Sequence, residues 1–271
     1  PYETRQVFYE SKDGTKVPMF ITCRKDIELD GSAPTLLYGY GGFAISLTPG
    51  YGVPCSVWLE HGGVYVVANL RGGNEYGREW HDAGKLLNKQ NVFDDFISAA
   101  EYLVDEGYTC SDKLAIWGGS NGGLLTAACM LQRPKLFGAV ISAVPVIDML
   151  RYHKFTCGRY WISDYGNAEE DENIFDYVMK YSPLHNVKAG ETYPPLIVMT
   201  ADTDDRVVPS HGKKFIATLQ HEAAKEGPLL LHVETKAGHG HGKPTSKRIE
   251  NRAYMLYFLF ETFGLTTENS A

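Results

Sequence analysis

The chain has 271 residues, of which 44% are hydrophobic and 22% are charged, and its formal net charge is -7. This balance is typical of a folded globular protein and too apolar for a disordered one. The net acidity excludes binding of a nucleic-acid backbone by bulk charge. No apolar run reaches the roughly 18 residues that predict a membrane span, so we expect neither a nucleic-acid nor a membrane partner.

The length is that of one α/β domain with a large core. No linker, charge block or internal repeat divides the chain, and we therefore predict a single domain over residues 1–271. The five cysteines are widely spaced and form no C-x-x-C or zinc pattern, which predicts free thiols and a cytoplasmic location. Because the chain begins with Pro1 and has no signal peptide, we expect it to be part of a longer protein.

The first 22 residues predict an antiparallel hairpin with Lys12, Asp13 and Gly14 in the turn. Short apolar and β-branched runs predict strands at residues 17–22, 35–38, 64–68, 113–117, 139–143, 196–200 and 229–234. Helices are predicted between and after them at residues 92–105, 122–133, 210–225 and 245–262. The later strands are almost continuously hydrophobic, which is typical of parallel strands covered on both faces. The predicted fold class is α/β, with a mostly parallel sheet flanked by helices.

The strand predicted at residues 113–117 is followed directly by the pattern G-x-S-x-G around Ser120 and then by a helix. A tight strand-to-helix turn needs glycine two residues on either side of the serine, where a side chain would clash. Such a turn exposes the serine hydroxyl at the carboxyl end of the sheet, next to backbone N–H groups at the helix start. The sequence therefore predicts a nucleophilic serine in an α/β-hydrolase fold.

A serine nucleophile needs a base and a carboxylate that orients it. In this fold the acid and then the histidine follow in loops after later strands. The loop after residues 196–200 offers Asp202, Asp204 and Asp205, and residue chemistry alone does not choose among them.

The loop after residues 229–234 is rich in glycine and offers two candidate bases, His239 and His241. A zinc site through both histidines would lack a third ligand motif. We expect no metal and no organic cofactor.

Five motifs in order along nearly the whole chain closely resemble the peptidase domain of the prolyl oligopeptidase family. They are YGYGGF at 38–43, NLRGG at 69–73 followed by EYG at 75–77, GGSNGG at 118–123, DDRVVP at 204–209 and KAGHG at 236–240. The resemblance implies a catalytic triad of Ser120, Asp204 and His239. It also implies that the oxyanion is bound by the phenol of Tyr40 and the backbone N–H of Asn121.

The same resemblance implies an apolar slot for the proline ring of a substrate. The matching residues are Phe43, Val146, Trp161, Tyr165 and Val207, and Arg206 matches a residue that holds a substrate carbonyl. A flat aromatic face suits proline because its ring is compact and rigid.

The chain departs from the family pattern at His241, where many relatives have a small residue. The family also carries a β-propeller over the active site, and no propeller repeat is present in these 271 residues. We therefore expect this chain to be the carboxyl-terminal peptidase stretch, with the propeller domain elsewhere in the same protein.

The resulting hypothesis is a serine endopeptidase that cleaves short peptides after proline through an acyl-enzyme on Ser120. Attack by a peptide amine instead of water would make the protein a transpeptidase or macrocyclase. The same triad would also serve an esterase or an acylaminoacyl peptidase. A non-catalytic binding module is a further class, but Ser120, Asp204 and His239 are all retained.

Overall fold

The computed structural model describes residues 1–50, 52–224, 226–240 and 243–265. These residues form one eight-stranded sheet with the order β1-β2-β4-β3-β5-β6-β7-β8. The strands are β1 (Tyr2–Glu10), β2 (Lys16–Arg24), β3 (Thr35–Tyr38), β4 (Val64–Ala68), β5 (Leu114–Gly119), β6 (Ala139–Ala143), β7 (Leu196–Ala201) and β8 (Leu229–Glu234). β2 pairs antiparallel with β1 and β4, and the other neighbouring pairs are parallel.

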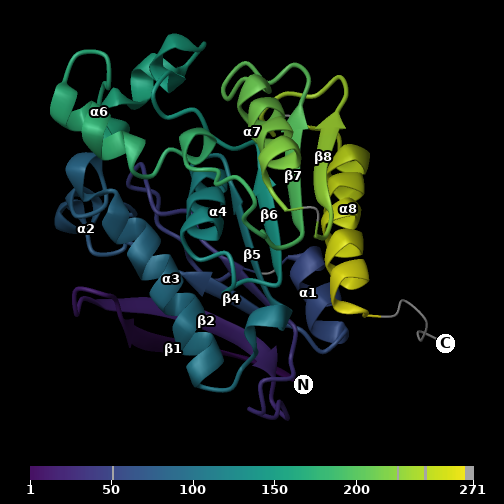
Figure 1. Cartoon of the computed structure of the whole chain (residues 1–271). Helices are drawn as coiled ribbons and strands as arrows, with labels where there is room; N and C mark the ends of the chain where they lie inside the picture. The colour runs from purple at the N-terminus through teal and green to yellow at the C-terminus, as the bar shows by residue number, and fades with distance from the viewer. Residues whose placement is uncertain (51, 225, 241–242, 266–271) are drawn as a thin grey trace.

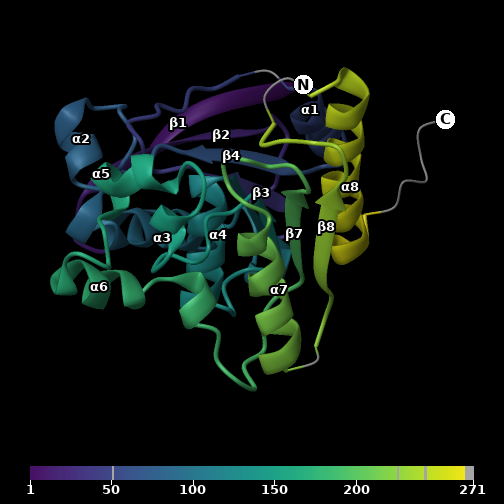
Figure 2. The same ribbon diagram turned by 90° about the horizontal axis from the view of Figure 1, so that it is seen from above.

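Helices cover both faces of this sheet. They are α1 (Val53–Glu60), α2 (Arg78–Asp82), α3 (Gln90–Asp105), α4 (Asn121–Gln132), α5 (Ile162–Tyr165), α6 (Glu172–Met179), α7 (Ser210–Glu222) and α8 (Thr245–Phe263). α3, α4 and α7 lie on one face, and α1 and α8 lie on the other (Figures 1 and 2). The small helices α2, α5 and α6 gather beside α3, on the side away from α8.

The side-chain pattern of β5 explains the two covered faces. Leu114 and Ile116 belong to the core cluster that includes α3 and α4. Ala115 and Trp117 belong to the cluster that includes Trp58 of α1 and the apolar residues of α8. Because successive side chains of a strand point to opposite faces, an unbroken apolar run supplies both cores.

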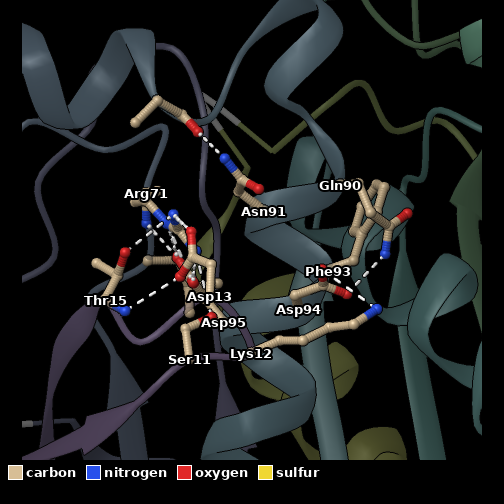
Figure 3. Close-up of polar contacts among 12 residues, drawn as sticks. Ser11, Lys12, Asp13, Thr15, Arg71, Gln90, Asn91, Phe93, Asp94 and Asp95 are labelled. Atoms are coloured by element: carbon tan, nitrogen blue, oxygen red, sulfur yellow. Dashed lines mark hydrogen bonds and ion pairs between the residues drawn. The ribbon is translucent and has the colours of Figure 1, made fainter.

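A buried arginine ties the amino-terminal hairpin to the rest of the domain. Arg71 follows β4, and its guanidinium lies 2.5 Å from Asp95 of α3 and 2.5 Å from Asp13 in the turn between β1 and β2 (Figure 3). Its side chain is 5% exposed, and that of Asp95 is fully buried. The buried pair with Asp95 fixes the guanidinium against α3. The same guanidinium contacts the half-exposed Asp13, so it connects the hairpin turn to α3.

The predicted hairpin, strands and four long helices are confirmed, and their ends differ from the prediction by no more than three residues. The helix predicted over residues 210–225 is shorter, because Ala223 is extended at ψ 155°, and residue 225 lies outside the described residues. The sequence does not predict the short helices α1, α2, α5 and α6, which have four to eight residues each. About two turns are too few for a clear 3.6-residue period. All five cysteines are described and are free thiols, as predicted.

Candidate active site

Ser120 lies in the turn between β5 and α4, with φ 58° and ψ -115°. This left-handed backbone is uncommon for a residue with a side chain and stores strain. A Cβ atom on Gly118 would overlap the carbonyl of Gly122, and one on Gly122 would lie 2.7 Å from the carbonyl oxygen of Gly39. Both glycines of the pattern are therefore needed for the turn, as the sequence predicts.

Asn121 directly follows Ser120, and the loop that carries Tyr40 contacts it. Asn121 is the first residue of α4 and is 1% exposed. Its side-chain amide donates to the carbonyl oxygen of Tyr40 at 2.6 Å. Burial raises the pKa of the Tyr40 phenol to about 12, and a side-chain hydrogen bond with Ser120 opposes this shift. The phenol is consequently protonated at neutral pH, and its O–H lies close enough to Ser120 to donate to a group bound there.

Asp204 and His239 come together from the loops after β7 and β8. His239 Nδ1 lies 2.7 Å from Asp204 Oδ2. The other carboxylate oxygen, Oδ1, accepts the backbone N–H groups of Arg206 and Val207 at 3.0 and 2.8 Å. The Asp204 side chain is fully buried and that of His239 is 12% exposed. A carboxylate held this way fixes both the orientation and the tautomer of the imidazole.

The structure also separates Asp204 from the other two aspartates of its loop. Asp202 is exposed, and its Oδ1 accepts the backbone N–H of Ala237, so it ties the two loops together. Hydrogen bonds from this backbone lower the pKa of Asp202. Asp205 is exposed. His241, the second histidine candidate, lies outside the described residues.

The residues assigned to the proline slot form a connected group of aromatic rings. Phe43 and Tyr165 meet edge to face at 5.4 Å, and Tyr165 meets Tyr152 at 5.2 Å. Tyr152 in turn stacks on Trp161 at 6.3 Å. Phe43 and Trp161 are partly exposed, whereas Tyr165 is 1% exposed. Two of the predicted rings therefore offer surface to a ligand, and the third lies beneath them.

The remaining slot candidates lie in loops at the same carboxyl edge of the sheet. Val146 follows β6 and Val207 follows β7, and each is 2% exposed. Arg206 is exposed, and within the described residues it pairs with no carboxylate. Its guanidinium is thus available to a ligand in this part of the structure.

A cavity of about 320 Å³ lies between His239 and α8. Its walls include Trp117, His239, Lys243 and Arg252. Phe43, Tyr152, Trp161 and Tyr165 are absent from its walls. It is therefore separate from the assigned slot, which lies open at the carboxyl edge of the described chain.

A group of polar residues lies behind the site, and the sequence does not predict it. Lys89 donates to Asn121 Oδ1 at 3.1 Å, and Tyr165 donates to the same oxygen at 2.8 Å. Asp164 accepts the backbone N–H of Phe43 and lies 3.0 Å from His81 Nε2. These partners are 32 to 121 residues apart in the chain, and no local pattern connects them.

The strand order, the strained strand–turn–helix at Ser120 and the acid and histidine loops after β7 and β8 define an α/β-hydrolase. A family model described as the prolyl oligopeptidase family matches residues 53–266. The chain belongs to this family, in agreement with the resemblance found in its motifs.

Curated relatives match almost the whole chain. Prolyl endopeptidase of Elizabethkingia miricola is 51% identical over 264 residues, which cover 97% of this chain and 37% of that protein. The dual function macrocyclase-peptidase POPB of Galerina marginata is 44% identical over 268 residues, covering 97% of this chain and 37% of that protein. The chain thus spans a little over a third of the length of these relatives.

Solved structures agree with this result. A structure from a structural and mechanistic study of two prolyl endopeptidases has a TM-score of 0.95 and 54% identity, covering 98% of this chain and 39% of that one. Apo prolyl oligopeptidase B from Galerina marginata has a TM-score of 0.91 and 42% identity, covering 98% of this chain and 37% of that one.

Proposed function

We propose that this chain carries the active site of a serine endopeptidase that cleaves short peptides after proline, through an acyl-enzyme on Ser120. The observation that carries the proposal is the pair of the buried Asp204 and the partly buried His239, 2.7 Å apart, at the sheet edge where Ser120 lies in its strained turn. Prolyl endopeptidases about 50% identical over the chain support the substrate class.

The proposed acylation starts from the Nε2 atom of His239, because Nδ1 faces Asp204. Nε2 takes the proton of Ser120 while Oγ attacks the carbonyl carbon of the proline residue, and the carbonyl oxygen becomes an oxyanion. The phenol of Tyr40 and the backbone N–H of Asn121 donate to this oxyanion. His239 then gives its proton to the leaving amine, and water attacks the acyl-enzyme by the same route.

Proline specificity is proposed to come from Trp161 and Phe43, the partly exposed rings of the aromatic group, with Tyr165, Val146 and Val207 behind them. The exposed Arg206 would hold a substrate carbonyl on the amino-terminal side of proline. Changing Trp161→Ala should depress the turnover of a proline peptide far more than that of a simple ester. Parallel kinetics with both substrates test this, and equal losses would favour an esterase.

A digest of a short peptide with one internal proline, analysed by mass spectrometry, tests the function itself. We expect the complete protein to cut the peptide once, after proline, and to give two products. The Ser120→Ala variant should give none. A cyclic or ligated product would instead indicate transpeptidation, the reaction class suggested by the macrocyclase-peptidase relative. Cleavage at unrelated residues, or cleavage by Ser120→Ala, would contradict the proposal.

Two further expectations remain predictions. The length of the relatives supports a further domain, the propeller, in the same protein. The free thiols support a cytoplasmic location. Among the described residues, no helix is both long and apolar enough to cross a membrane.

A further inference from the structure

A buried lysine lies behind the two groups that we assign to the oxyanion. Lys89, at the start of α3, is 2% exposed. Its Nζ donates to the carbonyl oxygen of Gly41 at 2.8 Å and to Asn121 Oδ1 at 3.1 Å. In the described part of the chain it forms no salt bridge, although burying an amine without a carboxylate is costly. Its contacts are instead two oxygen acceptors and the faces of the Phe93 and Tyr165 rings.

Lys89 completes a set of hydrogen bonds that joins two distant segments. Asn121 donates to the carbonyl oxygen of Tyr40, and Lys89 donates to the next carbonyl, that of Gly41. The glycine-rich loop that carries Tyr40 is thus bound at two successive peptide groups to the start of α4. A Cβ atom on Gly42 would lie 2.7 Å from Asn121 Nδ2, so the loop lies directly on this amide.

We propose that Lys89 is a positioning residue which, through Asn121 and Gly41, sets the distance between the two oxyanion donors. An oxyanion hole is effective only when both donors lie about 2.7–3.1 Å from the developing charge. The Tyr40 loop contains three glycines and has φ +64° at Gly41, so it has little rigidity of its own. The inference rests on the proposed function, because the donors are those assigned there.

The geometry does not require a charged amine. Burial lowers the pKa of Lys89 to about 7, against an opposing influence of Asp164. A neutral amine still has two N–H groups, which are enough for Gly41 and Asn121. The two hydrogen bonds therefore hold in both protonation states.

The test is Lys89→Met in the complete protein, which keeps a long apolar side chain but removes the donor. We expect kcat for a proline peptide to fall about 10- to 100-fold while KM changes less than about twofold. A peptide aldehyde ending in proline, which forms a tetrahedral adduct with Ser120, should lose affinity by a similar factor. The corresponding peptide acid, which forms no adduct, should bind as it does to the wild type.

Lys113→Met is the matched control. Lys113 also donates to a backbone carbonyl, that of Ser32 at 2.8 Å, but it directly precedes β5 at the opposite edge of the sheet. This variant should keep the wild-type kcat.

Asn121→Ala provides an independent test, because it keeps the backbone donor and removes the amide that joins Lys89 to the loop. It should reproduce the loss of kcat with little change in KM. The double variant should have nearly the same kcat as the slower of the two single variants, because both changes break the same connection.

Three outcomes would overturn the inference. In the first, the wild type cleaves the proline peptide and the Lys89→Met variant keeps the wild-type kcat. In the second, the Lys89→Met variant loses affinity for the aldehyde and for the acid by the same factor. The third applies if Lys89→Met does not fold: an unchanged kcat in the Asn121→Ala variant then contradicts the inference. A wild type that cleaves no proline peptide would instead contradict the proposed function, and the inference would fall with it.

Discussion

The two carboxylate oxygens of Asp204 have different partners, and this gives the residue its proposed role. Oδ1 accepts two backbone N–H groups and Oδ2 faces His239, so the side chain is fixed before any substrate binds. We predict that Asp204→Asn lowers kcat about 10⁴-fold, because the amide would favour the wrong tautomer of His239.

Asp205→Asn is the control for this prediction. Asp205 is the next residue of the same loop and is exposed, so its variant should keep nearly full activity. Steady-state kinetics of both variants with one proline peptide make the comparison. If Asp205→Asn were the inactive variant, the acid would be wrongly assigned.

Residue chemistry alone left three aspartates and two histidines open, and only the family resemblance chose between them. The structure supports Asp204 because Asp202 and Asp205 are exposed while Asp204 is buried against His239. A string of neighbouring acids does not reveal which one turns inward. Lys89 could not be predicted at all, because its role depends on partners 48 and 32 residues away.

Among the elements, α7 holds the loop after β6 through one histidine. His211 of α7 is 1% exposed, and its Nδ1 lies 3.2 and 3.0 Å from the backbone N–H groups of Ile147 and Asp148. Nδ1 accepts both hydrogen bonds only when it carries no proton. Burial lowers the pKa of His211 to about 4, so Nδ1 carries no proton near neutral pH and can accept both hydrogen bonds. This loop also carries Val146, a residue of the proposed slot.

A pH-dependent stability follows from this arrangement. An unfolded histidine has a pKa of about 6.5, so between pH 6.5 and 4 the unfolded state binds more protons than the folded state. Stability from His211 is present above this window and is lost as the pH falls through it, by up to about 1.4 kcal/mol per pH unit.

Urea unfolding at several pH values checks the His211 prediction. The control is His211→Asn, whose side-chain oxygen accepts hydrogen bonds without titrating. This variant should show a flatter loss of stability between pH 6.5 and 4. Identical slopes for the variant and the wild type would contradict the prediction.

The elements themselves were largely predictable, for a physical reason. Parallel strands covered on both faces are continuous apolar runs, and the long helices α3 and α8 have enough turns to show their period. Short helices are different: α6 owes its start to Asp171, which accepts the backbone N–H groups of Asn173 and Ile174. A cap of this kind in a polar segment resembles an ordinary turn.

Across the whole molecule, Arg71 connects the hairpin, the loop after β4 and α3. Arg71→Met would leave the fully buried Asp95 with the backbone N–H of residue 71 but without its charged partner, and we expect a loss of about 3–5 kcal/mol in the free energy of unfolding. Asp13→Asn is the control, because the Asp13 side chain is 48% exposed and should cost less than about 1 kcal/mol. Urea titrations of both variants make the comparison, and similar losses would show that the pair with Asp95 is not the anchor.

The most direct test of the central claim is a labelling experiment on the complete protein with a phosphonate ester that carries a peptide ending in proline. Intact mass and peptide mapping would locate the adduct, while cleavage of a proline peptide is followed in the same samples. We predict one adduct on Ser120, a parallel loss of cleavage, and no adduct in the His239→Ala variant. Cleavage that persists after full labelling, or an adduct on another residue, would contradict the assignment of Ser120 as the nucleophile.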